Sequence, residues 1–242
     1  MNEQSKRFLL NLLSAASPSG FEEPAARIWR AEAEQFADEV RVDVNGSSHA
    51  RLRGNGPVVV IEGHIDEIGL MITHIDDQGY LWFRGIGGWD DQMLIGQRVR
   101  LMGQGGITTG VIGRAPIHLL SEEERGRAAK IKDLWIDIGA KDGDEAHKRV
   151  TVGDVAVIEQ PPIELGNNRL IARGIDNRAG SYVALETLRL LAADRPAADV
   201  YAVAATQEEI SQSGARTSAY ALQPAVAIVV DVTHATDVPG AD

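Results

Sequence analysis

Helical and strand patterns alternate along residues 181–231, which read SYVALETLRLLAADRPAADVYAVAATQEEISQSGARTSAYALQPAVAIVVD. Residues 181–193 and 214–222 have the pattern of helices, whereas 200–206 and 226–231 are short apolar runs typical of buried strands. Helices and strands that alternate in this way favour a mainly parallel sheet covered by helices. The predicted fold class is therefore α/β.

The amino-terminal part of the chain adds helices and strands to this domain. The apolar stripe from Phe8 to Leu13 predicts a first helix. Ser19 with Glu22 three residues later has the form of a capping box, so a second helix is expected over about 22–36. Three strands are then expected, the first two joined by a turn at Asn45-Gly46: residues 40–44, 50–53 and 58–62.

The middle of the chain, from Ile68 to about Glu159, has a different sequence pattern. Short strands with alternating apolar residues are punctuated by glycine there, a pattern typical of a small β barrel. The simplest architecture joins both ends of the chain into one α/β domain that carries the β-rich segment as an insertion. The predicted segments are 1–66 and 160–242 for the α/β domain and 67–159 for the inserted domain.

Composition limits the class of function. The chain has 242 residues, with 24 Lys or Arg against 35 Asp or Glu, and its formal net charge of −11 argues against nucleic acid or an anionic membrane as a partner. There is no cysteine, which excludes thiol nucleophiles, disulfides and cysteine-ligated zinc. The apolar runs are too short to span a bilayer, and the polar amino terminus lacks the apolar core of a signal peptide. A cytoplasmic protein is expected.

Polar residues follow the predicted strands where each strand ends, which is where open α/β sheets bind ligands. His64 and Asp66 follow the strand at 58–62. In a metal site the imidazole of His64 would bind the ion while the carboxylate of Asp66 accepts its other N–H. A pair of this kind is also common at ordinary surface turns, so by itself it leaves both interpretations open.

Further carboxylates occupy similar positions. Glu208 and Glu209 follow the strand at 200–206, where they are either a solvated helix start or a general base beside a metal ligand. Asp231 ends the last strand and either caps a turn or binds a metal. Asp176 precedes a helix, which it caps unless it bridges two cations instead. Together these sites offer only oxygen and imidazole donors, which suit zinc, cobalt or manganese.

Four segments match one enzyme family in order and spacing: GHIDEIG at 63–69, GIDNR at 174–178, TQEE at 206–209 and DVTHATD at 231–237. The sequence resembles the cytoplasmic metalloaminopeptidases of the glutamyl-aminopeptidase and tetrahedral-aminopeptidase family, some of whose relatives have been labelled endoglucanase or cellulase. Residues 18–22 and 153–154 match as well, so the resemblance covers the whole chain. It implies a zinc-peptidase-like α/β domain with an inserted β domain that serves assembly into a homo-oligomer.

The resemblance also implies two divalent metal ions, zinc or cobalt, in the complete site. One would be held by His64, Asp176 and Asp231. The other would be held by Asp176, Glu209 and a histidine far along the carboxyl-terminal part. This sequence stops before that histidine, and His234 belongs to a different motif position, so a carboxyl-terminally truncated chain is expected.

The activity that the resemblance implies is the removal of amino-terminal residues from peptide substrates. Glu208 would be the general base for metal-activated water, and Asp66 would stand behind His64. A related two-metal carboxypeptidase or deacylase is an alternative, as is a truncated, non-catalytic assembly chain that keeps the assembly domain but not a working site. A glycosidase, with Glu208 in an acid and nucleophile pair, is disfavoured by the metal-type residues.

Overall fold

The computed structural model describes residues 1–103 and 105–240; Gln104 and the last two residues of the predicted segment 160–242 lie outside the described residues. The chain forms two compact units. Unit 1 combines Met1–Glu67 with the chain from Pro162 onward, and unit 2 is formed by Ile68–Pro161. The chain of unit 2 is therefore inserted into the chain of unit 1.

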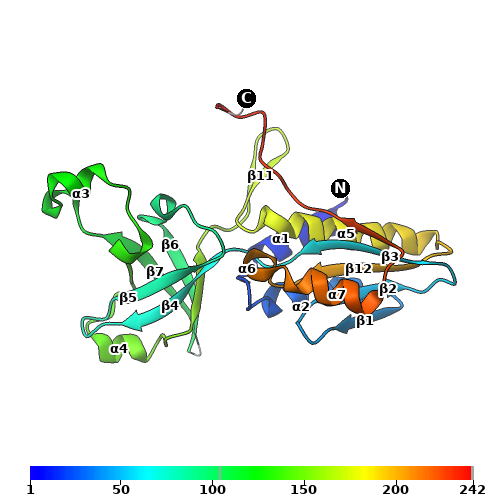
Figure 1. Cartoon of the computed structure of the whole chain (residues 1–242), viewed down its shortest axis with the longest axis horizontal. Helices are drawn as coiled ribbons and strands as arrows, with labels where there is room; N and C mark the ends of the chain where they lie inside the picture. The colour runs from blue at the N-terminus through cyan, green and yellow to red at the C-terminus, as the bar shows by residue number, and fades with distance from the viewer. Residues whose placement is uncertain (104, 241–242) are drawn as a thin grey trace. The chain divides into compact units, whose positions relative to one another are not determined.

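Unit 1 contains a five-stranded sheet with helices packed against it (Figure 1). Its elements in chain order are α1 (Glu3–Ser14), α2 (Glu23–Ala33), β1 (Glu39–Val42), β2 (Ser48–Leu52), β3 (Val58–His64), β10 (Ile163–Leu165), β11 (Arg169–Ile171), α5 (Ile175–Ala193), β12 (Asp199–Ala205), α6 (Glu208–Ser211), α7 (Ser213–Leu222) and β13 (Val226–Val229). The antiparallel pair β10–β11 and the short helix α6 are additional to the elements expected from the sequence.

The sheet of unit 1 has the strand order β1-β2-β12-β3-β13. β3 pairs in parallel with β12 on one side and with β13 on the other, and the predicted α/β class is confirmed. β1 and β2 extend the sheet in the antiparallel sense, so the sheet is mixed where a mainly parallel one was expected. The cause is the short turn between β1 and β2, because two strands joined by a tight turn must run in opposite directions.

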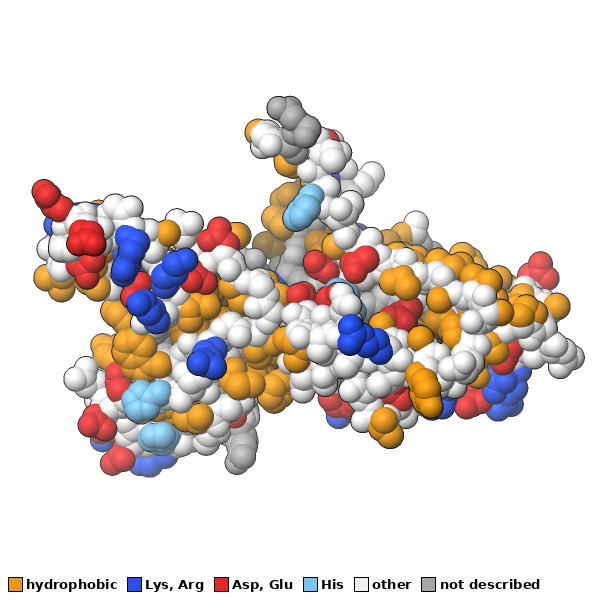
Figure 2. Space-filling view, viewed as in Figure 1, with side chains coloured by type: hydrophobic (Ala, Val, Ile, Leu, Met, Phe, Trp, Pro, Cys, Tyr) orange, Lys and Arg blue, Asp and Glu red, His pale blue; other side chains and the backbone are white. Residues whose placement is uncertain are grey.

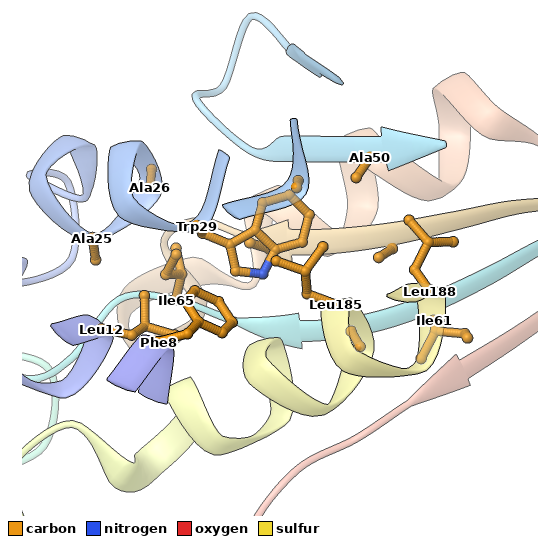
Figure 3. Close-up of a cluster of buried hydrophobic side chains, with 14 of the residues drawn as sticks. Phe8, Leu12, Ala25, Ala26, Trp29, Ala50, Ile61, Ile65, Leu185 and Leu188 are labelled. Atoms are coloured by element: carbon orange, nitrogen blue, oxygen red, sulfur yellow. The ribbon is translucent and has the colours of Figure 1, made fainter. Parts of the chain in front are cut away.

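The core of unit 1 lies between the sheet and helices α1, α2 and α5, and Figure 3 shows Trp29 among its neighbours there. Leu185 and Leu188 extend from α5 toward the sheet, and Phe8 comes from α1. The Trp29 side chain is fully buried and donates its indole N–H to the backbone oxygen of Ser181 at 2.9 Å. Each large apolar side chain in this core contributes on the order of 2 kcal/mol when it leaves water.

Helix α5 lies close to the ends of β3 and β13 because Gly63 and Gly180 have no side chains there. A Cβ atom at Gly63 would lie 2.3 Å from the backbone carbon of Gly180. A Cβ atom at Gly180 would lie 2.4 Å from the backbone oxygen of Val230. Because neither position leaves room for a side chain, the first turns of α5 lie directly against the ends of β3 and β13.

The loop before α2 is held by hydrogen bonds that differ from the predicted capping box. The hydroxyl of Ser17, and not that of Ser19, accepts a hydrogen bond of 2.9 Å from the backbone N–H of Ala25. Glu22 accepts a hydrogen bond of 3.1 Å from the backbone N–H of Gln207, which is 185 residues away. The predicted capping box is wrong because the carboxylate of Glu22 is used in this tertiary contact.

Unit 2 is a closed barrel with the strand order β4-β5-β8-β7-β6-β9 (Figure 1). Its elements, with η for a 3₁₀ helix, are β4 (Gly69–Ile75), β5 (Leu81–Ile86), η1 (Asp91–Leu94), β6 (Arg98–Gly103), β7 (Gly106–Arg114), η2 (Ile117–Leu119), α3 (Glu122–Gly126), η3 (Ile131–Asp133), β8 (Leu134–Asp137), α4 (Gly143–His147) and β9 (Val155–Ile158). The barrel encloses a core of its own, so the predicted barrel-like β domain is confirmed, although β8 was not among the expected strands.

Hydrophobic side chains are exposed on one part of the surface of unit 1. Val226, Ile228 and Val229 of the edge strand β13 are all exposed. Figure 2 shows hydrophobic side chains gathered where Figure 1 draws α5 and β13. Within residues 1–103 and 105–240, no helix is both long enough and apolar enough to cross a membrane.

Candidate metal centre

Three parallel strands of unit 1 carry polar side chains to one edge of the sheet. His64 is the last residue of β3 and pairs with Ala205, the last residue of β12. Glu208 and Glu209 follow β12 after a short turn, and Asp231 follows β13 by two residues. These side chains lie at the same edge because the carboxyl ends of parallel strands meet there.

His64, Asp176 and Asp231 form a candidate metal-binding group. Each offers one ligand atom, and the three atoms lie within 4.8 Å of one another. His64 is buried, whereas the two aspartates are exposed, and Figure 2 shows acidic side chains at the surface where Figure 1 draws the end of β3. One imidazole nitrogen and two carboxylate oxygens suit zinc or cobalt, so the donor set fits a divalent ion.

The ring of His64 is surrounded by carboxylates. Its Nε2 atom lies 3.1 Å from Oδ1 of Asp176 and 3.7 Å from Oε2 of Glu208. Its Nδ1 atom lies 3.3 Å from Oδ1 of Asp66, which is an electrostatic contact without the angle of a hydrogen bond. Burial alone would lower the pKa of His64, but Asp66, Glu208 and Asp176 outweigh it and raise the pKa to about 9. The site therefore favours positive charge at this position.

Asp66 is fully buried and connects the histidine to the two glutamates. Its Oδ1 atom accepts a hydrogen bond from the backbone N–H of Glu208 at 3.2 Å, and its Oδ2 atom accepts one from the N–H of Glu209 at 3.1 Å. Burial favours the neutral acid, but contact with His64 and the backbone N–H groups overcomes this and lowers the pKa of Asp66. The charged carboxylate thus holds the backbone from which both glutamate side chains start.

The two glutamates have different surroundings. Oε1 of Glu208 accepts a hydrogen bond of 3.4 Å from the side-chain amide of Gln212, which leaves Oε2 facing His64. Among the described residues, Glu209 is not part of the group whose ligand atoms lie within 4.8 Å. Burial raises the pKa of Glu209 to about 7, with His64 opposing the shift and the negative charge of Asp176 adding to it. Glu209 is therefore close enough to the group to sense its charges.

Asp176 is presented by the first turn of α5. Its side chain is 62% exposed and contacts Nε2 of His64. Asn177 supports the start of the helix, because its Oδ1 atom accepts a hydrogen bond of 2.9 Å from the N–H of Gly180. The side-chain amide of Asn177 also donates to the backbone oxygen of Val230 at 2.8 Å. The side chain that supports the start of the helix is thus that of Asn177, while the carboxylate of Asp176 contacts His64.

A buried ion pair that the sequence analysis did not single out lies behind the candidate group. Arg178 is fully buried and donates a hydrogen bond of 2.8 Å to Oε1 of Glu67. It also donates to the backbone oxygen of Ala15 at 2.6 Å. Arg178 follows Asp176 by two residues and Glu67 follows His64 by three, so the pair joins the two segments. Their positions inside the quoted motifs were the available signal.

A cavity of about 280 Å³ lies beside the candidate group. Its walls include His64, Glu208 and Asp231, together with Glu62 and Arg216. Glu62 is 7% exposed, and burial raises its pKa to about 7 although His64 opposes the shift. The sequence analysis missed Glu62, although a glutamate inside an apolar strand was a visible signal.

Comparison with known proteins agrees with the motifs. The family described as M42 glutamyl aminopeptidase matches residues 46–242. The chain belongs to the M42 glutamyl aminopeptidase family. The resemblance that the sequence motifs indicate is thereby confirmed.

One curated M42 relative is the FrvX protein of Escherichia coli strain K12, which is 36% identical over 97% of this chain. The chain spans 66% of the length of that relative. A TET aminopeptidase from a marine sediment archaeon, Thaumarchaeota archaeon SCGC AB-539-E09, has a solved structure that is 37% identical with a TM-score of 0.95, and the match covers 99% of this chain and 68% of the other. The M42 fold is therefore shared along almost the whole chain.

A second solved structure in the M42 family is the TET1 peptidase of Pyrococcus horikoshii. It is 33% identical, with a TM-score of 0.86, and the match covers 94% of this chain and 68% of the other. That peptidase is described as able to assemble into a tetrahedron or a large octahedral shell.

Proposed function

We propose that this M42 chain carries metal-binding and catalytic side chains of an aminopeptidase, which removes amino-terminal residues from peptides. The observation that carries the proposal is the position of Glu208, whose Oε2 atom lies 3.7 Å from Nε2 of His64. His64 belongs to the candidate group with Asp176 and Asp231. A carboxylate base beside a set of metal ligands is what hydrolysis by activated water requires.

Two divalent ions, zinc or cobalt, are proposed for the complete site. His64, Asp176 and Asp231 would hold one ion, and Asp176 with Glu209 would contribute to the second. A bound divalent ion lowers the pKa of water and polarises the carbonyl of the scissile bond. Asp66 would orient His64 from its buried position, since a carboxylate behind a metal-binding imidazole fixes the ring.

Glu208 is proposed as the general base. It would accept a proton from the attacking water and later deliver it to the leaving amine. Its side chain is partly exposed, so substrate and water have access to it. Its backbone N–H is held by Asp66 and its Oε1 atom by Gln212, so Oε2, which faces Nε2 of His64 at 3.7 Å, is the oxygen that would accept the proton.

Unit 2 is proposed to serve assembly into a homo-oligomer. Among the described residues, it contributes none to the candidate metal-binding group. Large apolar side chains are exposed on it, including Met93, Ile107, Ile117, Leu119 and Val152. The assembly described for the Pyrococcus horikoshii relative supports the same behaviour here. A cytoplasmic location and peptide substrates are proposed from the family resemblance.

The first experiment measures metal bound per chain by elemental analysis, after equilibration with zinc or cobalt and removal of the excess ion. We expect wild-type protein to retain metal and the Asp176→Ala variant to lose at least one equivalent. Asp194→Ala removes an exposed aspartate of the same unit and is the matched control. Protein that retains no metal, or an Asp176→Ala variant that retains as much as wild type, would contradict the proposed site.

A second experiment separates an aminopeptidase from a deacylase. Metal-loaded protein is offered peptides with a free amino terminus and, in parallel, N-acyl amino acids. Hydrolysis of the free-amino-terminal peptides supports the proposal. Hydrolysis of the N-acyl amino acids alone would overturn it in favour of a two-metal deacylase.

A further inference from the structure

We propose that Glu62 recognises the cationic side chain of a basic amino-terminal residue, Lys or Arg, inside the cavity beside the candidate metal centre. The inference rests on the proposed aminopeptidase function for the orientation of the substrate, and it adds the class of substrate. No metal ligand is reassigned by it.

Glu62 is a buried carboxylate with no hydrogen-bond partner among the described residues. It is 7% exposed and lines the cavity of about 280 Å³. In the part of the chain that the structure describes, its carboxylate makes neither a hydrogen bond nor an ion pair. Burying a carboxylate without a hydrogen-bond partner costs free energy, because the group gives up its hydration, and the attraction to His64 offsets only part of that cost. A glutamate in an otherwise apolar strand therefore points to a ligand with positive charge.

The position of Glu62 along β3 determines which part of a substrate can reach it. Side chains two residues apart on a strand share a face, so Glu62 lies on the face of His64, about 7 Å back along the strand. On the same face, Val60 packs in a buried apolar cluster with Tyr201 and Val203. A substrate side chain therefore cannot extend along β3 beyond Glu62. Glu62 is thus the innermost charged group on this side of β3.

The two ammonium groups of a basic residue differ in their reach. The α-amino group is bonded to the carbon beside the scissile carbonyl. When that carbonyl lies at the candidate metal group, the α-amino group must therefore lie near the metal group as well. The side chain of lysine ends in an ammonium group on a flexible four-carbon stem, which can span the distance from the metal group to Glu62. The geometry therefore favours the side chain, and not the α-amino group, as the partner of Glu62.

The other charges of the cavity discriminate between basic and acidic side chains. Arg216 also lines the cavity but is exposed, and an acidic side chain could pair with it only at the solvated edge. A basic side chain would instead meet Glu62 away from water, where attraction between opposite charges is stronger. Of the other charged groups on these walls, His64 and Asp231 belong to the candidate metal-binding group, and Glu208 adds a negative charge that also favours a cation.

The test compares the binding of two ligands that differ by one ammonium group. Lysinamide and norleucinamide are titrated by calorimetry into zinc-equilibrated protein, because both carry the α-amino group and the same straight side chain up to the terminal position. We expect wild-type protein to bind lysinamide about tenfold more tightly. Glu62→Gln, which keeps the shape of the side chain, should abolish the difference, whereas the exposed control Glu34→Gln should retain it.

Equal affinity of wild-type protein for the two amides would overturn the inference without any variant, so the test does not depend on how Glu62→Gln folds. A preference that persists in Glu62→Gln would also overturn it. Equal weakening of both amides in Glu62→Gln would assign Glu62 to the α-amino group instead, against the proposal. A preference that disappears in Glu62→Gln, in protein that hydrolyses no peptide, would support the site and contradict the aminopeptidase function.

Discussion

Nη2 of Arg178 donates a hydrogen bond of 2.8 Å to Oε1 of Glu67, across 111 residues of sequence and with both side chains buried. The inserted barrel lies between these residues in the chain, so the contact closes unit 1 around the insertion. Glu67 also accepts a hydrogen bond of 3.0 Å from the backbone N–H of Ser17. The pair therefore joins the segment of His64, the first turns of α5 and the loop after α1.

Removing one member of this pair should destabilise unit 1 strongly. Arg178→Ala leaves Glu67 with Arg173 as its remaining cationic partner and removes the donor that serves the buried backbone oxygens of Ile65 and Ala15. The loss of one partner of a buried ion pair costs about 3–5 kcal/mol. Urea unfolding followed by circular dichroism should show the loss in the free energy of unfolding. Arg27→Ala, which removes an exposed arginine paired with Glu23, is the control and should change stability little.

The contact between α5 and β3 should not tolerate a methyl group. Gly63→Ala would place a Cβ atom 2.3 Å from backbone atoms of α5, so the helix must move away from the strand. We expect a loss of about 1–3 kcal/mol or more in the free energy of unfolding, because the obstacle is backbone and cannot rotate aside. Gly166→Ala makes the same chemical change in unit 1 with nothing within 4 Å and is the control. Equal stability of the two variants would show that α5 is free to shift.

His49 should make the protein less stable in mild acid. It is 1% exposed, with Nε2 lying 3.0 Å from the hydroxyl of Ser218. Burial lowers the pKa of His49 from 6.5 to about 4, with Arg41 adding to the shift and Asp43 opposing it. As the pH falls below 6.5, the His49 imidazole becomes protonated in the unfolded chain but stays neutral in the folded chain. The free energy of unfolding therefore falls by up to about 3 kcal/mol by pH 4.

The variant His49→Gln tests this pH dependence. Glutamine does not titrate, so the fall in unfolding free energy between pH 7 and pH 4.5 should be smaller in the variant than in wild type. His118→Gln changes an exposed histidine and is the matched control. An unchanged pH dependence in His49→Gln would mean that the buried ring is not the group responsible.

Variants of Glu208 and Asp176 should distinguish a loss of catalysis from a loss of metal binding. Glu208→Gln keeps the shape of the side chain but cannot accept a proton, so the rate of peptide hydrolysis should fall by about 10²- to 10⁴-fold while metal content is retained. Asp176→Ala should lose both activity and metal. Hydrolysis at the wild-type rate by Glu208→Gln would require a different base.

Local patterns in the sequence were sufficient for much of the fold. Helical spacing from Phe8 to Leu13 and in 181–193, the turn at Asn45-Gly46 and the short apolar strands each reflect interactions within a few residues, so they can be read without coordinates. The polar residues after each strand could also be named in advance, because parallel strands present their carboxyl ends together. The capping box at Ser19 misled because Glu22 is bonded to Gln207, a residue no local pattern connects to it.

The sequence by itself determined which residue types stand at the strand ends, including His64, Asp176 and Asp231, and that helix and strand alternate after residue 180. Only the tertiary structure decided that the ligand atoms of these three lie within 4.8 Å and that β2 pairs with β12, which joins the β1–β2 hairpin to the sheet. It also decided that Glu62 is buried beside the site without a hydrogen-bond partner among the described residues. Spacing along the chain governs helices and turns, whereas burial and contact across more than a hundred residues depend on how the whole unit packs.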